Sequence, residues 1–284
     1  MNDTKDGVLN RIDRYVKKGD LDLDATLRDL VKLQESGNKR VYLYEASPSA
    51  LRKLDLARLP RLKEDLADVT ILSSPASPGV SYSWVGGKTI RISFAETHQT
   101  VDVDYARQRI RTVPITRVVV ASLNLDTGFV WIAYDAPEHL IPHGSQLNYY
   151  RYYVNQVESI AGITLEPYDI HPALMKLEKS ELVRLTYGRS LTPDGIVDLI
   201  SESDYRKMGV YDDVRKDVVA KERGRYIWLC PASMAEEQAQ RHADVPLLRD
   251  VPTEIYGRSN LIRFTRDCVE EEVEYVLGQI RDHA

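Results

Sequence analysis

Arginine is the residue type whose spacing in this sequence points most directly to chemistry. Arg107, Arg109 and Arg111 alternate along one short segment, and Arg117 follows them. Guanidinium groups pair with phosphate oxygens, so clustered arginines are typical of proteins that contact a nucleic-acid backbone. Together with arginines from other motifs, the predicted nucleic-acid contacts are Arg107, Arg109, Arg111, Arg117, Arg151, Arg189 and Arg258.

A run of aromatic residues surrounds one of these arginines. Tyr149, Tyr150, Tyr152 and Tyr153 flank Arg151, and nucleic-acid bases stack on exposed tyrosine rings. Successive residues of a helix point in different directions, so we expect at least two of these tyrosines to lie in the core. The alternative interpretation is a solvated arginine surface beside an aromatic core helix.

The tetrapeptide Tyr-Gly-Arg-Ser occurs twice, at residues 187–190 and 256–259. A glycine turn followed by an arginine and a hydroxyl could present backbone N–H groups and a guanidinium to a phosphate. In the alternative interpretation, which we favour, the glycine makes a turn, the tyrosine packs and the arginine is solvated.

Signatures of common enzymes are missing from the sequence. There is no glycine-rich dinucleotide fingerprint, P-loop, nucleophile elbow or HExxH motif. His139 and His143 have the spacing of metal ligands, but Pro142 lies between them and disfavours the continuous helix that they would need. We therefore expect no metal site and no cofactor, and the sequence leaves open whether the protein is an enzyme.

Acidic residues in the second half support one enzymatic alternative. A metal-dependent nuclease needs an acid at a bend, followed by a strand with an acid-x-lysine pattern. Asp169 precedes Glu178 and Lys179, which are adjacent in the chain, and no acid-x-lysine strand follows Asp194. The alternative is thus an atypical phosphodiester-cleaving or nucleotide-processing enzyme that uses Asp169, Asp194 or Asp198.

The composition is that of a globular protein. The chain has 284 residues, of which 43% are hydrophobic, which is enough for a sizeable core. The formal net charge of −5 argues against a uniformly basic surface but allows a local basic groove.

Cys230 and Cys268 form no CxxC pair, which disfavours a cysteine zinc site. Without a signal-peptide pattern or a long apolar run, we expect the protein in the cytoplasm and not in a membrane.

Two β-hairpins are the clearest structural features that must position these residues. Residues 80–85 and 89–94 alternate around Gly86-Gly87, and residues 115–125 and 129–136 flank Asp126-Thr127-Gly128. The apolar run Val118 to Val120 predicts a central strand that is covered on both faces.

The remaining periodicities predict helices and further strands. Helices are expected at residues 8–19, 24–37, 145–162, 210–220, 233–243 and 269–280, and at starts near Ser47 and Thr192; strands are expected at 40–45, 69–72, 182–187, 226–230 and 261–265. Pro167 and Pro172 bracket a candidate domain boundary. The sequence therefore predicts an α+β fold. Residues 1–166 would form a helical hairpin with an antiparallel meander sheet, and residues 167–284 a mixed α/β subdomain.

The predicted function is that of a non-enzymatic binding or assembly component. Its ligand would be nucleic acid or a protein partner, because local basic clusters and 17 tyrosines accompany the missing catalytic signatures. A homo-oligomeric structural subunit is a further alternative.

Overall fold

The computed structural model describes residues 39–51, 79–104, 109–134 and 146–284, together with isolated positions between 15 and 22. The predicted strand at 69–72 lies outside the described residues, as does the predicted N-terminal helical hairpin apart from those isolated positions.

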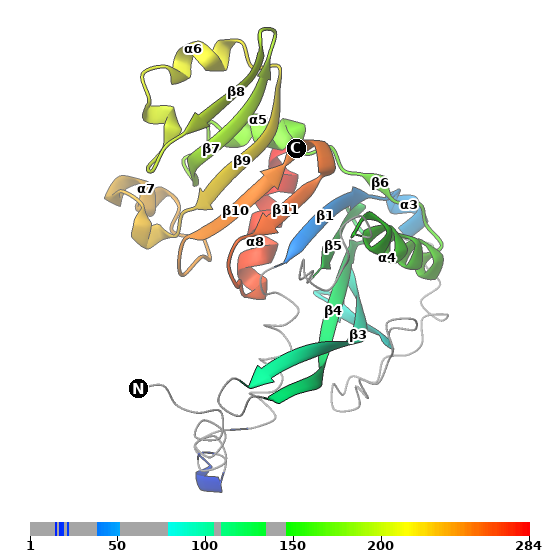
Figure 1. Ribbon diagram of the computed structural model, residues 1–284. Helices are drawn as coiled ribbons and strands as arrows, with labels where there is room; N and C mark the ends of the chain where they lie inside the picture. The colour runs from blue at the N-terminus through cyan, green and yellow to red at the C-terminus, as the bar shows by residue number, and fades with distance from the viewer. Residues whose placement is uncertain are drawn as a thin grey trace.

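One antiparallel sheet of 11 strands runs through the described residues (Figure 1). Its strands are β1 (Arg40–Glu45), β2 (Gly79–Val85), β3 (Thr89–Asp104), β4 (Arg109–Asn124), β5 (Phe129–Tyr134), β6 (Glu166–Pro167), β7 (Val183–Thr192), β8 (Gly195–Ile200), β9 (Ala220–Trp228), β10 (Val251–Tyr256) and β11 (Leu261–Phe264). The strand order is β2-β3-β4-β5-β1-β11-β10-β9-β7-β8, with β6 paired to β1. The fold is α+β, as predicted.

Strand β1 joins the two halves of the sheet. It pairs with β5 on one side and with β11 on the other, so strands from both halves of the chain meet there. The sheet thus continues across the boundary predicted at residue 166. The division into domains 1–166 and 167–284 remains a prediction.

Both predicted hairpins are confirmed. Gly86 and Gly87 have φ angles of 58° and 70° in the turn between β2 and β3, a conformation that favours glycine. Gly128 has φ 76° in the second turn, and a Cβ there would meet the Ala46 carbonyl oxygen at 2.1 Å. Val118 to Val120 are buried in β4, which has β3 and β5 as neighbours, so the predicted central strand is also confirmed.

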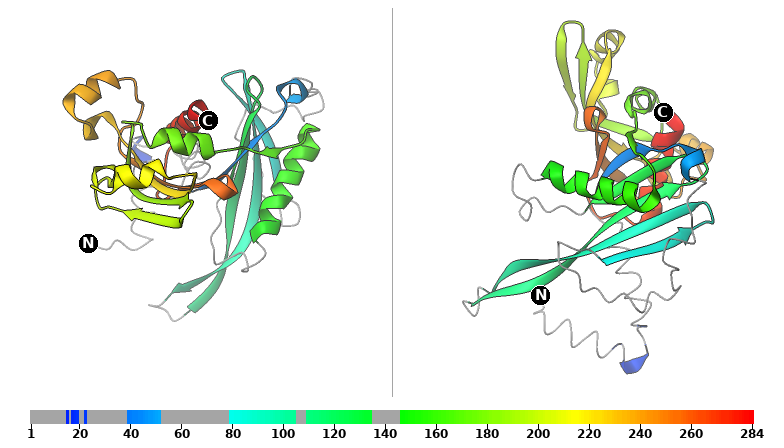
Figure 2. Two further views of the ribbon diagram at one scale, coloured as in Figure 1. Left: turned by 90° about the horizontal axis from the view of Figure 1, so that it is seen from above. Right: turned by 90° about the vertical axis from the view of Figure 1, so that its right-hand side faces the viewer.

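Helices cover different parts of the two sheet faces. The described helices are α3 (Pro48–Leu51), α4 (Gln146–Ala161), α5 (His171–Leu177), α6 (Tyr211–Lys216), α7 (Glu236–Arg241) and α8 (Glu270–His283). Helix α4 lies on one face, over β3, β4, β5 and β1, where its apolar side completes one core cluster. Helices α5 and α8 lie on the opposite face and complete the other cluster, as Figure 2 shows. We call these two sides the α4 face and the α8 face.

Helix α4 confirms the aromatic core helix expected from the sequence. It ends before Gly162, whose φ is 62°. Tyr150 and Tyr153 are buried against the sheet, whereas Arg151 and Tyr152 are exposed.

The helix predicted to start at Thr192 is wrong. Pro193 and Asp194 form the turn between β7 and β8, and Thr192 pairs with Gly195, whose φ is 130°. Thr-Pro-Asp suits a helix start, but proline and aspartate are also favoured turn residues, and here the two flanking segments pair as strands.

The sequence did not predict β8 or β10. The helices predicted at 210–220 and 233–243 are shorter in the structure, because β9 begins at Ala220 and α7 spans Glu236–Arg241.

No helix in the described part of the chain has the length and apolar character needed to span a bilayer.

Candidate ligand-binding face

The α4 face of strands β7 to β11 has no described helix over it. In Figure 1 these strands face the viewer, and α5 and α8 lie behind them. The opposite side of the same strands carries the buried core residues, among them Leu185, Tyr226 and Ile262. The strands are therefore apolar on one side and open on the other.

A β-bulge in β7 brings a tyrosine to the open side. Leu185 pairs with Tyr226, and Tyr187 pairs with Arg225, which leaves Thr186 as an extra residue. Residues two apart in a regular strand point to the same face. Because of the extra residue, Leu185 points into the core while Tyr187 points to the open side.

A second irregularity, in β9, separates another pair of side chains. Arg189 lies opposite Arg223, and Ser190 lies opposite Lys221, so Glu222 is the extra residue. Lys221 and Ser190 are buried, whereas the two arginines are partly exposed. The short segment between the two bulges thus turns both arginines outwards.

The resulting surface, which we call the arginine face, extends over five strands. Its members are Arg184, Tyr187, Arg189, Asp198, Arg223, Arg225, Glu254, Tyr256 and Arg263. The arginine side chains are 35–58% exposed. Five guanidinium groups thus share this face with the carboxylates of Asp198 and Glu254, and Arg184 also pairs with Asp250 at 3.5 Å.

Glu254 lies at the centre of the arginine face. Its carboxylate accepts hydrogen bonds from Arg225 Nε at 2.8 Å, Arg223 Nη2 at 3.0 Å and the Tyr256 hydroxyl at 2.8 Å, and Arg263 Nη1 lies 3.9 Å away. Burial raises the pKa of Glu254, but the hydrogen bonds outweigh burial and lower its pKa to about 2. One ionised carboxylate thus holds three guanidinium groups.

Asp198 holds the outer end of the face in the same way. Arg189 Nε and Nη2 each donate a hydrogen bond of 2.9 Å to it, and the Tyr187 hydroxyl donates one of 2.8 Å. The hydrogen bonds from Arg189 and then Tyr187 lower the pKa of Asp198. Burial and the bond to Asp198 raise the pKa of Tyr187, so its hydroxyl stays protonated.

The two Tyr-Gly-Arg-Ser copies meet at one arginine. The Arg223 guanidinium lies 5.7 Å from the ring centroid of Tyr187 and 4.6 Å from that of Tyr256. Contacts of this length are cation–π interactions. The Arg223 guanidinium therefore packs against both tyrosine rings.

The glycines of the two copies have packing roles. Gly188 lies within β7 and not in a turn, so the expected glycine turn is wrong for the first copy; the second copy forms a 3-10 turn at Gly257–Ser259. A Cβ at Gly188 would meet the Tyr205 hydroxyl at 2.8 Å, and one at Gly257 would meet the Lys221 carbonyl oxygen at 2.4 Å.

A buried polar cluster supports β7 from the α8 face. Glu178 accepts a 2.6 Å hydrogen bond from the Tyr205 hydroxyl and forms an ion pair with Lys221. Lys221 also donates to Ser190 Oγ at 2.7 Å. Each of these side chains is almost fully buried. The cluster links α5, β7 and β9 beneath the arginine face.

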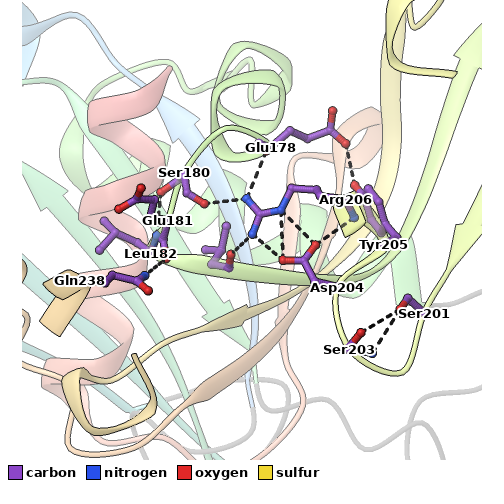
Figure 3. Close-up of polar contacts among 11 residues, drawn as sticks. Glu178, Ser180, Glu181, Leu182, Ser201, Ser203, Asp204, Tyr205, Arg206 and Gln238 are labelled. Carbon is purple, nitrogen blue, oxygen red and sulfur yellow. Dashed lines mark hydrogen bonds and ion pairs between the residues drawn. The ribbon is translucent and has the colours of Figure 1, made fainter. Parts of the chain in front are cut away.

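Arg206 fixes the loop that leads into β7, as Figure 3 shows. Its guanidinium donates to the carbonyl oxygens of Glu178 at 3.2 Å, Ser180 at 2.7 Å and Val183 at 2.5 Å. Asp204 accepts from the same guanidinium and from the Arg206 backbone N–H. These hydrogen bonds tie the loop to the start of β7.

Of the arginines predicted from the sequence, one belongs to the arginine face and another pairs with a residue beside it. Arg189 belongs to the arginine face, and Arg258 forms an ion pair with Glu222, the residue before Arg223. Arg151 is exposed on α4.

The arginine run that led the sequence prediction lies elsewhere, on β4. Arg117 is only 7% exposed and lies opposite Glu96 on β3, so it offers little surface to a ligand. Arg109 and Arg111 have described backbone positions on β4 only, and Arg107 lies outside the described residues.

Sequence reasoning missed Arg223, Arg225 and Arg263. A signal was present, because Arg223 and Arg225 are two residues apart in a segment with strand character and therefore share a face.

The acids of the enzymatic alternative lie in three different elements. Asp169 accepts a hydrogen bond from the His171 backbone N–H before α5, Asp194 lies in the β7–β8 turn, and Asp198 binds Arg189. Among the described residues, no three His, Cys, Asp or Glu side chains gather closely enough to hold a metal ion.

Fold and site together define an α+β protein with one large antiparallel sheet and an open, arginine-rich sheet face. No protein-family model matches the chain, and a search of curated proteins finds no significant match.

Proposed function

We propose that this protein is a non-enzymatic binding component that holds single-stranded nucleic acid on its arginine face. The observation that carries the proposal is the gathering of five arginines and two tyrosines on a sheet face with no described helix over it. Guanidinium groups bind phosphate oxygens, and aromatic rings stack on bases. Proteins that bind single strands combine these two contacts.

The electrostatics of the face favour a polyanion over an ordinary protein partner. Arg189 and Arg223 lie directly opposite each other, and Arg225 is two residues further along β9. Like charges in such positions repel. Asp198 and Glu254 offset part of this repulsion, and an anionic strand laid across the arginines offsets more of it. A flexible single strand suits this surface because its bases can reach the tyrosines.

A salt titration with matched arginine variants tests the proposal. An unstructured single-stranded oligonucleotide is titrated with the protein over a range of salt concentrations, followed by fluorescence anisotropy. For Arg225→Gln we expect weaker binding and a slope of log K against log salt that is shallower by about 0.7, the loss of one phosphate contact.

Arg241 provides the control. It lies on α7, is 60% exposed and pairs with Glu181, whereas Arg225 is 58% exposed and pairs with Glu254. Arg241→Gln therefore removes the same charge from a side chain of similar exposure outside the arginine face, although its partner Glu181 is 52% exposed and Glu254 only 6%. If the two substitutions change oligonucleotide affinity and its salt dependence equally, the arginine face is not the binding surface. No binding of RNA or DNA at low salt would leave only a protein partner as the ligand.

A further inference from the structure

A hollow lies on the open side of the sheet beside the arginine face. It has a volume of about 350 Å³ and is lined by Thr186, Ile227, Pro252 and Thr265 and by the ion-paired side chains of Arg225, Arg263 and Glu254. This volume is within the range of sites for small ligands. From Glu254 the hollow extends along the strands over the next outward-facing pair, which is Pro252 on β10 and Ile227 on β9.

The floor and rim of the hollow differ in chemistry. Ile227 and Pro252 supply an apolar floor, since both point away from the core on adjacent strands. Thr186, the bulged residue of β7, and Thr265 border this floor, and the Thr265 hydroxyl donates a hydrogen bond of 3.2 Å to the Pro252 carbonyl oxygen. A flat ring with polar edges matches an apolar floor that polar residues border.

One wall of the hollow carries two guanidinium groups and the Glu254 carboxylate that holds them. Arg225 uses its Nε to bind Glu254, and Arg263 approaches the same carboxylate at 3.9 Å. An arginine carries five N–H donors, so both guanidinium groups keep donors for an anion. The side chains are 58% and 42% exposed, which lets an anion approach them.

We propose that the hollow holds one nucleotide of the bound strand. Its base lies over Ile227 and Pro252, and its phosphate is held by Arg225 and Arg263. This inference rests on the proposed function and adds a defined subsite to it. A nucleoside monophosphate contains both chemical groups and serves as the minimal probe.

Competition measurements test the subsite on the full chain. A labelled single-stranded oligonucleotide is displaced with a nucleoside monophosphate, the corresponding nucleoside, or inorganic phosphate. We expect the monophosphate to compete at least about tenfold better than either fragment, because only it fills both halves of the site. In Arg263→Gln, the monophosphate should lose its advantage over the nucleoside.

A matched pair of charge substitutions locates the site on the sheet. Ile227→Glu places a carboxylate on the floor of the hollow, whereas Ile196→Glu places one on β8, where Ile196 is 57% exposed. The general electrostatic effect on a polyanion is similar for both. We expect Ile227→Glu to abolish competition by the monophosphate and to weaken oligonucleotide binding about tenfold more than Ile196→Glu does. If Ile227→Glu fails to fold, Thr265→Asp at the exposed rim replaces it.

The outcomes separate this inference from the proposed function. Oligonucleotide binding that depends on Arg225, but with no competition by the monophosphate and equal effects of the two glutamates, overturns the subsite and leaves the proposed function standing. If direct calorimetry shows monophosphate binding but no oligonucleotide binds, the proposed function is overturned, and with it the nucleotide of a bound strand; the hollow is then a site for a free nucleotide. Absence of both kinds of binding overturns both.

Discussion

Replacing Glu254 with glutamine should destabilise the protein in a pH-dependent way. The carboxylate is 6% exposed and accepts hydrogen bonds from Arg223, Arg225 and Tyr256. Glutamine keeps the size of the side chain but removes the charge that holds the guanidinium groups together. The two arginines of β9 then repel each other without compensation.

The magnitude follows from the pKa of Glu254. A fall from the ordinary value of 4.5 to about 2 corresponds to about 3 kcal/mol of stabilisation at pH 7. Because the native pKa lies below that of the unfolded chain, this stabilisation is complete well above pH 4.5 and is lost as the pH falls towards 2. At pH 3.5 we expect about 2 kcal/mol to remain.

Urea denaturation of the wild type and Glu254→Gln at pH 7 and pH 3.5 measures this difference. The free-energy gap between the two proteins should be about 3 kcal/mol at pH 7 and should narrow by about 1 kcal/mol at pH 3.5. Asp198→Asn is the control, since it removes a carboxylate from the more exposed end of the same face and should cost less. A gap that stays constant with pH, or one no larger than that of the control, would refute the role assigned to Glu254.

Three further substitutions test the support beneath the face, all by urea denaturation at neutral pH. Gly188→Ala should lower the free energy of unfolding by about 1–3 kcal/mol, because the new Cβ would meet the Tyr205 hydroxyl at 2.8 Å. Gly209→Ala is the control and should lower it far less, since nothing lies within 4 Å of a Cβ at that position. An equal loss in both would contradict the packing argument. Lys221→Met should lower the free energy of unfolding by about 3–5 kcal/mol, because it leaves buried Glu178 without its cation. Adding Glu178→Gln should restore part of that stability. If the effects of the two substitutions simply add, the ion pair contributes nothing. Tyr205→Phe should cost about 1–3 kcal/mol through the lost 2.6 Å hydrogen bond to Glu178, and an unchanged stability would show that this bond contributes little.

Local signals predicted the first half of the sheet. The β2–β3 hairpin needs only alternating side chains and two glycines that accept positive φ, and both features lie within a few residues of each other. Helix α4 was likewise predicted from its periodicity and from Gly162, which ends it. In each case the residues that decide the structure are neighbours in the sequence.

The arginine face depends on pairing between distant segments, which the sequence pattern does not contain. Arg225 meets Glu254 only because β9 pairs with β10, and it meets Tyr187 only because β7 has a bulge at Thr186. The two Tyr-Gly-Arg-Ser copies show the same limit: Gly188 lies in a strand and Gly257 in a 3-10 turn. Identical local sequences adopt different structures here because their neighbours differ.

The ion pairs of the arginine face prepare it for a ligand as well as stabilising it. Glu254 and Asp198 fix Arg225 and Arg189 in single orientations, so less side-chain entropy is lost when a phosphate binds the remaining donors. The same carboxylates also repel a polyanion.

In Glu254→Gln the repulsion between residue 254 and the polyanion disappears, while part of the preorganisation of the arginines is lost. If the first effect is the larger, oligonucleotide affinity at low salt rises although the protein becomes less stable. We expect this result, because the arginines remain anchored by the sheet while a full negative charge is removed from the centre of the face. Anisotropy measured at low and high salt checks it, since a gain that comes from charge must shrink as salt increases.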